Sequence, residues 1–319
     1  MKHETSADAH GAFPGSTVAR RMFFALMLFA TTSVAQTGAS PQKVFSSPEA
    51  GASALVEAVK ANDESALREI LGRRGVDLIG LRKPSSDRQQ HERFLAAYQE
   101  SNKLVPHGDA RMVLEVGKDA WPFPIPLVKE AEGWRFDARL GEQEALARRI
   151  GRNELAAIQV CLAIADSQRE YASVDRNGNG VLEYAPKFVS TAGKHDGLYW
   201  ESASGESLSP LGPFVAAAGI DSGAPRIALE RASYQGYFYR ILAQQGKNAK
   251  GGAYSYIVRG RMIGGFAVVA YPARYGYTGV KSFMINHDGE VYEKDLGKNT
   301  EAIAKKIRAF DPDPSWKRP

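Results

Sequence analysis

The sequence has little of what most enzyme and metal centres are made from. It contains one cysteine in 319 residues, so no disulfide can form within the chain. That cysteine, Cys161, lies between Ile158 and Leu162 in a helical pattern, where a thiol behaves as a small buried hydrophobe. No neighbouring base is visible that would lower its pKa. The histidines outside the first 35 residues lack the i, i+4 spacing of helical metal ligands.

The sequence also lacks a membrane-spanning run and a cluster of like charges. The apolar run MFFALMLFATT has about eleven residues, whereas a spanning helix needs about twenty. Lys and Arg number 41 against 36 Asp and Glu, and the basic residues form no stripe of the kind that binds nucleic acid. We therefore expect no nucleic-acid partner, and no transmembrane segment once a signal peptide is cleaved.

The N-terminal residues have the pattern of an export signal. Arg20 and Arg21 precede the apolar run, and Ser33 and Ala35 place small residues where a signal peptidase reads them. We predict a signal peptide over residues 1–35, a spacer over 36–43, and a mature protein in the periplasm or outside the cell. The arginine pair also suits the twin-arginine route, so the export route stays open.

Residues 44–140 are predicted to form a small α+β domain. Ser47 and Pro48 begin one helix, Asp63 begins a second that Gly72 ends, and a third runs from Asp87 to Asn102. The pattern then changes to short strands, at residues 111–116, 125–129 and 133–136. This order is loosely similar to the NTF2-like fold. In the segment WPFPIP the prolines predict an edge strand with Trp121 packed in the core; the alternative is a polyproline recognition element.

Residues 141–319 are predicted to form a second domain, in which a long helix packs on an antiparallel sheet. The helix begins near Gly141, and its predicted apolar stripe consists of Leu155, Ile158, Leu162, Ala165 and Ala172. Asp288-Gly289 predicts a tight hairpin, and Asn299 begins a last helix through Phe310. The polar residues from Arg148 to Glu154 form either a ligand-facing patch or an ion network between domains, and we favour the network.

The loop DRNGNGVLE matches the first half of a calcium-binding loop. Side-chain or backbone oxygens alternate along it, and Gly180 allows the sharp turn. The second half departs from an EF-hand, because Pro186 stands where that motif has a bidentate glutamate. The alternative is an Asx-rich turn. The residues of the possible calcium site are Asp175, Asn177, Asn179, Val181 and Glu183.

Two further groups of side chains are candidates for binding. Eight tyrosines fall between Tyr234 and Tyr277, and could line a glycan-binding face or pack within the sheet. His195 and Asp196 lie near Ser209 in the sequence, but no nucleophile elbow surrounds that serine. The candidate binding residues are Tyr237, Tyr239, Tyr271, Tyr275, His195, Asp196, Tyr199 and Trp200.

Several long motifs resemble a bacterial family catalogued as domain of unknown function 2950. They are WPFPIPLVK, GWRFD, RRIGRNEL, DGLYW, SPLGP, GYFYRIL, GGFAVVAYPARYG and EKDLGKNT. The resemblance implies an exported bacterial protein of two parts and carries no activity. From Asn153 onward the element order is also similar to the globular heads of type IV pilins and type II secretion pseudopilins, some of which hold calcium. The apolar arm that polymerises pilins is absent here, so filament formation is not expected.

These observations lead to three functional hypotheses. We favour an exported, non-enzymatic binding or assembly protein of the bacterial cell envelope, with an envelope protein or a glycan as its partner. The alternatives are a cell-envelope enzyme of hydrolase type that uses the His195 and Asp196 region, and a carbohydrate-binding module that uses the tyrosine-rich sheet. No cofactor other than calcium is suggested.

Overall fold

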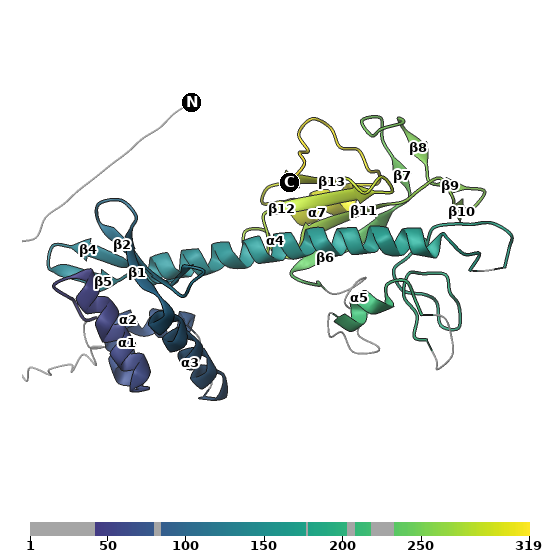
Figure 1. Ribbon diagram of the computed structural model, residues 1–319. Helices are drawn as coiled ribbons and strands as arrows, with labels where there is room; N and C mark the ends of the chain where they lie inside the picture. Colours follow the sequence, from purple (N-terminus) through teal and green to yellow (C-terminus); the bar gives the residue numbers. More distant parts are fainter. Residues whose placement is uncertain (1–41, 80–83, 177, 203–207, 218–232) are drawn as a thin grey trace, which may run out of the picture. The chain divides into compact units, whose positions relative to one another are not determined.

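The computed structural model describes residues 42–79, 84–176, 178–202, 208–217 and 233–319 (Figure 1). The predicted signal peptide and most of the predicted spacer lie outside these ranges. Within them, no helix combines the length and the apolar character needed to cross a bilayer.

Three helices come first in the described chain: α1 (Pro48–Lys60), α2 (Glu64–Leu78) and α3 (Pro84–Glu100). Helix α1 begins as predicted, because Ser47 Oγ accepts a hydrogen bond from the backbone N–H of Ala50. Gly72 ends the first part of α2 as predicted, because its φ of 71° and ψ of 165° are not helical. A second short helical segment follows it and continues to Leu78, within the same range.

A small antiparallel sheet follows, with the strand order β1-β2-β4-β5 and β3 paired beside β2. Its strands are β1 (Asn102–Pro106), β2 (Arg111–Val116), β3 (Trp121–Pro122), β4 (Leu127–Glu130) and β5 (Gly133–Phe136). Strand β1 was not predicted, since its polar first half hides the alternation. The first hydrophobic core lies between this sheet and the helices, and Leu55, Leu71 and Ile125 are fully buried in it.

Helix α4 (Ala138–Tyr171) is the longest element of the described chain. It begins three residues before the predicted start, because Asp137 Oδ1 accepts hydrogen bonds from the backbone N–H groups of Arg139 and Leu140. The predicted stripe is partly confirmed, because Ala165 is buried and Ile158 and Leu162 pack half-buried against the second core. Its first residue is wrong, since Leu155 is 67% exposed. The buried side chains of this helix range from small to aromatic. They are Ala157, Val160, Cys161, Ile164, Ala165, Ser167, Gln168 and Tyr171.

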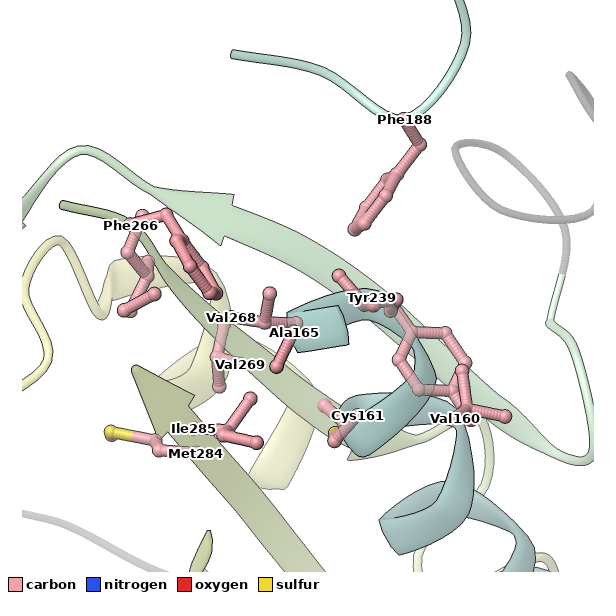
Figure 2. Packing of buried hydrophobic residues seen from close by; sticks show 14 of the residues in the cluster. Val160, Cys161, Ala165, Phe188, Tyr239, Phe266, Val268, Val269, Met284 and Ile285 are labelled. Carbon is pink, nitrogen blue, oxygen red and sulfur yellow. The ribbon is translucent and has the colours of Figure 1, made fainter. Parts of the chain in front are cut away.

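The second sheet has the order β13-β12-β11-β6 and is antiparallel throughout. Its strands are β6 (Tyr237–Leu242), β11 (Ala267–Pro272), β12 (Lys281–Asn286) and β13 (Val291–Asp295). Every residue of β11 is buried, because α4 and the short helix α7 (Thr300–Lys306) both pack on the sheet. Figure 2 shows Cys161 and Ala165 of α4 among Val268 and Ile285 of the strands. The α+β class and the long helix on a sheet are therefore confirmed.

Shorter elements complete the C-terminal part. They are α5 (Gly212–Ala217), the pair β7 (Gln244–Gln245) and β8 (Tyr254–Ser255), and the pair β9 (Ile257–Val258) and β10 (Arg261–Met262). The Asp288-Gly289 turn joins β12 to β13 as predicted, with Gly289 at a φ of 83°. Helix α7 follows Asn299 but ends at Lys306, before the predicted Phe310.

Candidate functional site

A pocket of about 540 Å³ opens in the N-terminal part of the chain. Helices α1 and α3, the end of α2, and strands β2 and β3 supply its walls. Leu55, Val59, Val116 and Phe123 are buried and form an apolar lining. Phe94 and the methyl group of Ala97 complete the wall from α3. Volumes between about 300 and 1,000 Å³ are typical of small-molecule sites.

The polar groups of the pocket come from α3. Gln90 and Arg93 are exposed, and His91 is half-buried. The Nε2 atom of His91 is buried and has no hydrogen-bond partner among the described residues. A buried imidazole nitrogen gains a partner when a ligand with a donor or acceptor enters beside it.

Trp121 lines the same pocket and is 48% exposed, so the expectation that it packs in the core is wrong. Strand β3 consists of Trp121 and Pro122 alone. The next residue, Phe123, packs in the first core in place of Trp121 and is 6% exposed. The guanidinium of Arg148 lies 5.4 Å from the indole ring. Arg148 is itself held by Glu144, with Nε and Oε1 2.7 Å apart. The exposed indole is therefore supported from helix α4.

The described residues that line this pocket offer no obvious catalytic pair. None of them is an aspartate, glutamate, cysteine, serine, threonine, lysine or tyrosine. A general acid or base would have to be His91, and no nucleophile lies beside it. Sequence reasoning missed this pocket, although the proline-flanked aromatics of WPFPIP were a signal that this strand leaves the sheet early.

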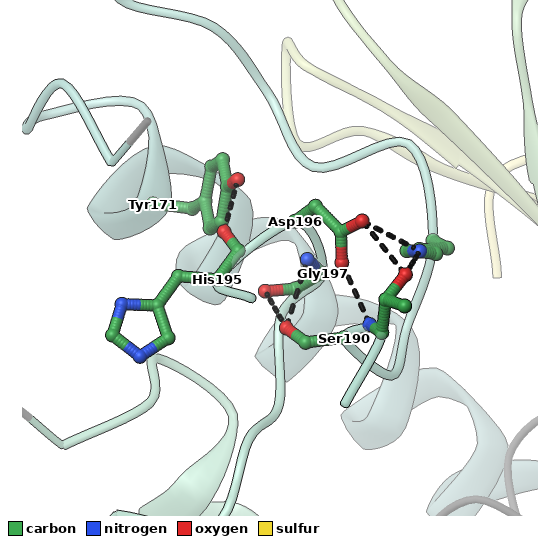
Figure 3. Close-up of polar contacts among 7 residues, drawn as sticks. Tyr171, Ser190, His195, Asp196 and Gly197 are labelled. Carbon is green, nitrogen blue, oxygen red and sulfur yellow. Dashed lines mark hydrogen bonds and ion pairs between the residues drawn. The ribbon is translucent and has the colours of Figure 1, made fainter. Parts of the chain in front are cut away.

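The His195 and Asp196 region forms a closed loop (Figure 3). Asp196 Oδ1 accepts the backbone N–H of Thr191 at 2.7 Å, and its Oδ2 accepts from Thr191 Oγ1 and Lys187 Nζ, both at 2.8 Å. The backbone carbonyl of His195 accepts the Tyr171 hydroxyl at 2.6 Å. Figure 3 shows the His195 imidazole pointing away from the Asp196 carboxylate. Asp196 therefore orders the loop and does not orient the imidazole as a catalytic triad requires.

The environment of Asp196 also changes its acidity. Partial burial raises the pKa of this carboxyl, but the hydrogen bonds and the charge of Lys187, together with both donors of Thr191, outweigh that effect and lower the pKa to about 2. The carboxylate is thus charged at any physiological pH. A group with so low a pKa is a poor general base at neutral pH.

His195 stacks on the ring of Trp200, with centroids 4.3 Å apart. Trp200 is 7% exposed, and the Arg176 guanidinium lies 5.4 Å from its ring. Tyr199 is half-buried and pairs with Val189 in a parallel bridge. Ser209 is 3% exposed. The structure therefore brings His195 and Trp200 together as a stack, and uses the neighbouring residues to pack the loop.

The predicted calcium loop is closed by its own hydrogen bonds. Asp175 Oδ2 accepts the backbone N–H of Gly180 at 2.8 Å, and its Oδ1 accepts that of Asn179 at 3.2 Å. Asn179 Nδ2 donates to Glu183 Oε1 at 3.2 Å. Asn177 lies outside the described residues. Asp175, Asn179 and Glu183 are thus brought into one loop by contacts that an Asx turn also makes.

One side-chain oxygen of the loop already accepts a hydrogen bond from an arginine outside it. Asn179 Oδ1 accepts from the backbone N–H of Val181 at 2.9 Å and from Arg261 Nη1 at 3.1 Å. Over the described residues, no group of three or more His, Cys, Asp or Glu side chains is placed to hold a metal ion. Calcium binding at this loop stays a prediction.

Three of the four candidate tyrosines are buried, and Tyr237 and Tyr239 belong to the second core. Tyr237, Tyr239 and Tyr271 have exposures of 0%, 5% and 7%. Tyr275 is half-buried, and its hydroxyl donates to Asp295 Oδ2 at 3.2 Å. Burial leaves the first three rings little surface to offer a glycan.

The polar residues from Arg148 to Glu154 contact both the chain before α4 and the chain after it. Asn153 Nδ2 donates to the carbonyl of Thr278 at 2.8 Å, and Glu154 Oε1 accepts from the backbone N–H groups of Val280 and Lys281. With the Arg148 contacts described above, these bonds tie α4 to the chain on both sides of it. They are mostly hydrogen bonds to backbone, where an ion network was expected.

Comparison with known proteins agrees with the motifs in the sequence. The family described as protein of unknown function (DUF2950) matches residues 42–318, nearly all of the described chain. Neither the curated proteins nor the solved structures contain a match. The likeness to NTF2-like folds and to pilin heads therefore rests on element order alone. The match over residues 42–318, which include the pocket, the closed loop and both cores, shows that the chain belongs to the DUF2950 family.

Proposed function

We propose that this protein is an exported binding protein that takes a small, mainly apolar molecule into the pocket between α1, α3 and β3. The pattern of Arg20, Arg21 and the apolar run that follows supports export to the periplasm or the extracellular medium. Binding without chemistry is supported by the lining of the pocket, which offers no nucleophile beside His91.

The observation that carries the proposal is an open cavity with an apolar interior. Its volume of about 540 Å³ suits a molecule of drug or fatty-acid size. Water inside finds few hydrogen-bond partners on Leu55, Val59 and Phe123, so an apolar ligand displaces it favourably. A cavity of this kind has no evident value to the fold itself, because empty volume in a core costs stability.

The rim favours a ligand that carries one acidic group. Arg93 supplies a charged donor, and Trp121 supplies an exposed flat ring. His91 Nε2 is a further polar atom beside the apolar wall. A carboxylate on an aliphatic or aromatic body would therefore place its charge at Arg93 and its apolar part inside.

The proposal is tested with a pocket-filling substitution on α3. Ala97 lines the pocket, whereas Ala96 is exposed on the same helix and does not. We expect the mature protein to bind 1-anilinonaphthalene-8-sulfonate saturably, with dodecanoate displacing the dye. Ala97→Phe fills the cavity and weakens dye binding by about tenfold or more, while Ala96→Phe leaves it unchanged.

Two further measurements make the test decisive. The melting temperatures of both variants show whether each still folds. Arg93→Gln is expected to weaken dodecanoate but not dodecanol, because only the former carries a charge for the guanidinium. Equal dye binding by Ala97→Phe and Ala96→Phe, with both folded, would place the dye elsewhere and refute the pocket.

A further inference from the structure

Two arginines stack on one exposed tyrosine in the C-terminal part of the chain. The guanidinium carbon of Arg149, on α4, lies 4.7 Å from the ring centroid of Tyr277, and that of Arg274 lies 4.1 Å from it. Tyr277 is 41% exposed. We propose that this Arg149–Tyr277–Arg274 cluster binds a phosphate group or a similar doubly charged oxyanion.

The charges of the cluster are not compensated by the described chain. No carboxylate there forms an ion pair with Arg149 or Arg274, and neither guanidinium makes a side-chain hydrogen bond to a described residue. The neighbouring Arg148 differs, since it pairs with Glu144. Glu154, the next acid after Arg149 along the helix, directs Oε1 to the backbone of Val280 and Lys281 instead.

Stacking leaves the guanidinium edges available. An arginine that lies over a ring contacts it with its flat face, so its N–H groups point outward around the edge. Because the two guanidinium carbons lie 4.7 Å and 4.1 Å from one ring centroid, they are at most 8.8 Å (4.7 + 4.1) apart, and the cluster gathers two positive charges around Tyr277. An oxyanion with three acceptor oxygens satisfies both guanidiniums and removes the repulsion between them.

The loop that carries Arg274 and Tyr277 is held in shape by its own hydrogen bonds, without a ligand. Thr278 Oγ1 accepts the backbone N–H of Arg274 at 3.0 Å, and the carbonyl of Arg274 accepts the backbone N–H groups of Tyr277 and Thr278. Asn153, one helical turn after Arg149, donates from Nδ2 to the carbonyl of Thr278 at 2.8 Å. The helix and the loop are thus fixed to each other beside the cluster, which lowers the cost of ordering a binding site.

The experiment is an isothermal calorimetric titration of the mature protein with inorganic phosphate at low ionic strength. Saturable binding is expected, and Arg149→Gln and Arg274→Gln should each weaken it by about tenfold. Arg259→Gln is the matched control, because it removes the same charge from an exposed arginine of the β9–β10 turn. Tyr277→Phe keeps the ring and is expected to retain binding, whereas Tyr277→Ala frees both guanidiniums and weakens it.

The outcomes separate the alternatives. No saturable binding by the wild type, or an equal loss in Arg259→Gln, would overturn the proposal and leave only an effect of net charge. Retention on vesicles that contain phosphatidic acid, but not on uncharged vesicles, would identify a lipid headgroup as the source of the phosphate. Binding of inorganic phosphate without vesicle retention would identify a soluble phosphate compound. Melting temperatures of all variants exclude unfolding as the cause.

Discussion

The carboxylate of Glu154 holds the start of strand β12 to helix α4, since its Oε1 accepts the backbone N–H of Lys281 at 2.9 Å. The same oxygen accepts the N–H of Val280 at 2.8 Å. A charged acceptor for two backbone donors is stronger than a neutral one. This contact gives a polar residue in the middle of a long helix a structural role.

Replacing Glu154 by alanine removes the acceptor of two part-buried amides. We expect Glu154→Ala to lower the free energy of unfolding by about 1–3 kcal/mol, and Glu154→Gln to cost less because an amide oxygen remains. Urea denaturation measures both. Gln159→Ala, at an exposed position on the same helix, is the control. Similar stability of Glu154→Ala and Gln159→Ala would show that the contact contributes nothing.

Gln168 makes a buried two-way contact with the backbone of Ala185. Its Nε2 donates to the Ala185 carbonyl and its Oε1 accepts the Ala185 N–H, both at 2.8 Å, and the side chain is 0% exposed. Gln168→Leu keeps the volume but leaves both backbone groups buried without partners. We expect a loss of about 3 kcal/mol in urea denaturation, with an unchanged m-value. Gln159→Leu serves as control, and a loss below about 1 kcal/mol would contradict the prediction.

The low pKa of Asp196 predicts a specific pH dependence. Its folded-state pKa of about 2 lies below the value of about 3.9 for an unfolded aspartate, so the carboxylate stabilises the fold above that value and loses its effect as pH falls from about 4 to 2. The side chain is 37% exposed, so screening by solvent reduces its contribution to about 1 kcal/mol.

Asp196→Asn should therefore be less stable than wild type at pH 7, with the difference shrinking as the pH approaches 2. Chemical denaturation at pH 7, 4 and 2 measures the effect. Asp109→Asn is the control, because it makes the same substitution at an exposed aspartate. A difference that stays constant from pH 7 to pH 2 would be inconsistent with a carboxylate that loses its partners on protonation.

The loop at Asp175 distinguishes a turn from an ion site by its response to calcium. Asp175→Ala removes the acceptor of two backbone N–H groups, so we expect a loss of about 1 kcal/mol in the presence of a chelator. The calcium hypothesis adds a rise in melting temperature in millimolar Ca²⁺ that is absent from the variant. Equal melting of the wild type with calcium and with chelator would limit the loop to an Asx turn.

Several strands and helix starts were predictable because they depend on local patterns. Ser47 and the Asp288-Gly289 turn act on residues within a few positions, and β2 follows the predicted strand from Arg111 to Val116. The buried face of α4 was predictable only in part, since the predicted stripe included the buried Ala165 but also the exposed Leu155. Ala157 and Gln168 are buried while Leu155 is exposed. Small residues face the sheet where the helix approaches it closely, and a hydrogen bond makes a buried glutamine acceptable.

The pocket could not be predicted for a different reason. Leu55, Phe94 and Trp121 lie on three elements that are far apart in the sequence, and no spacing relates them. The Arg149–Tyr277–Arg274 cluster has the same origin, because a helix and a loop more than a hundred residues later supply its parts. A linear motif reveals a site only when neighbouring residues build it.

Helix α4 is a wall of both hydrophobic cores, and this has a thermodynamic consequence. Near its start Gly141 packs against Ile125 and Leu78, and Val160, Ile164 and Ala165 lie in the second core. Its 34 residues span about 50 Å without a proline. If the helix unfolds at either end, one core loses part of its packing surface, and the cooperativity of the helix transmits this loss to the other core. Heat should therefore melt both cores in a single calorimetric peak.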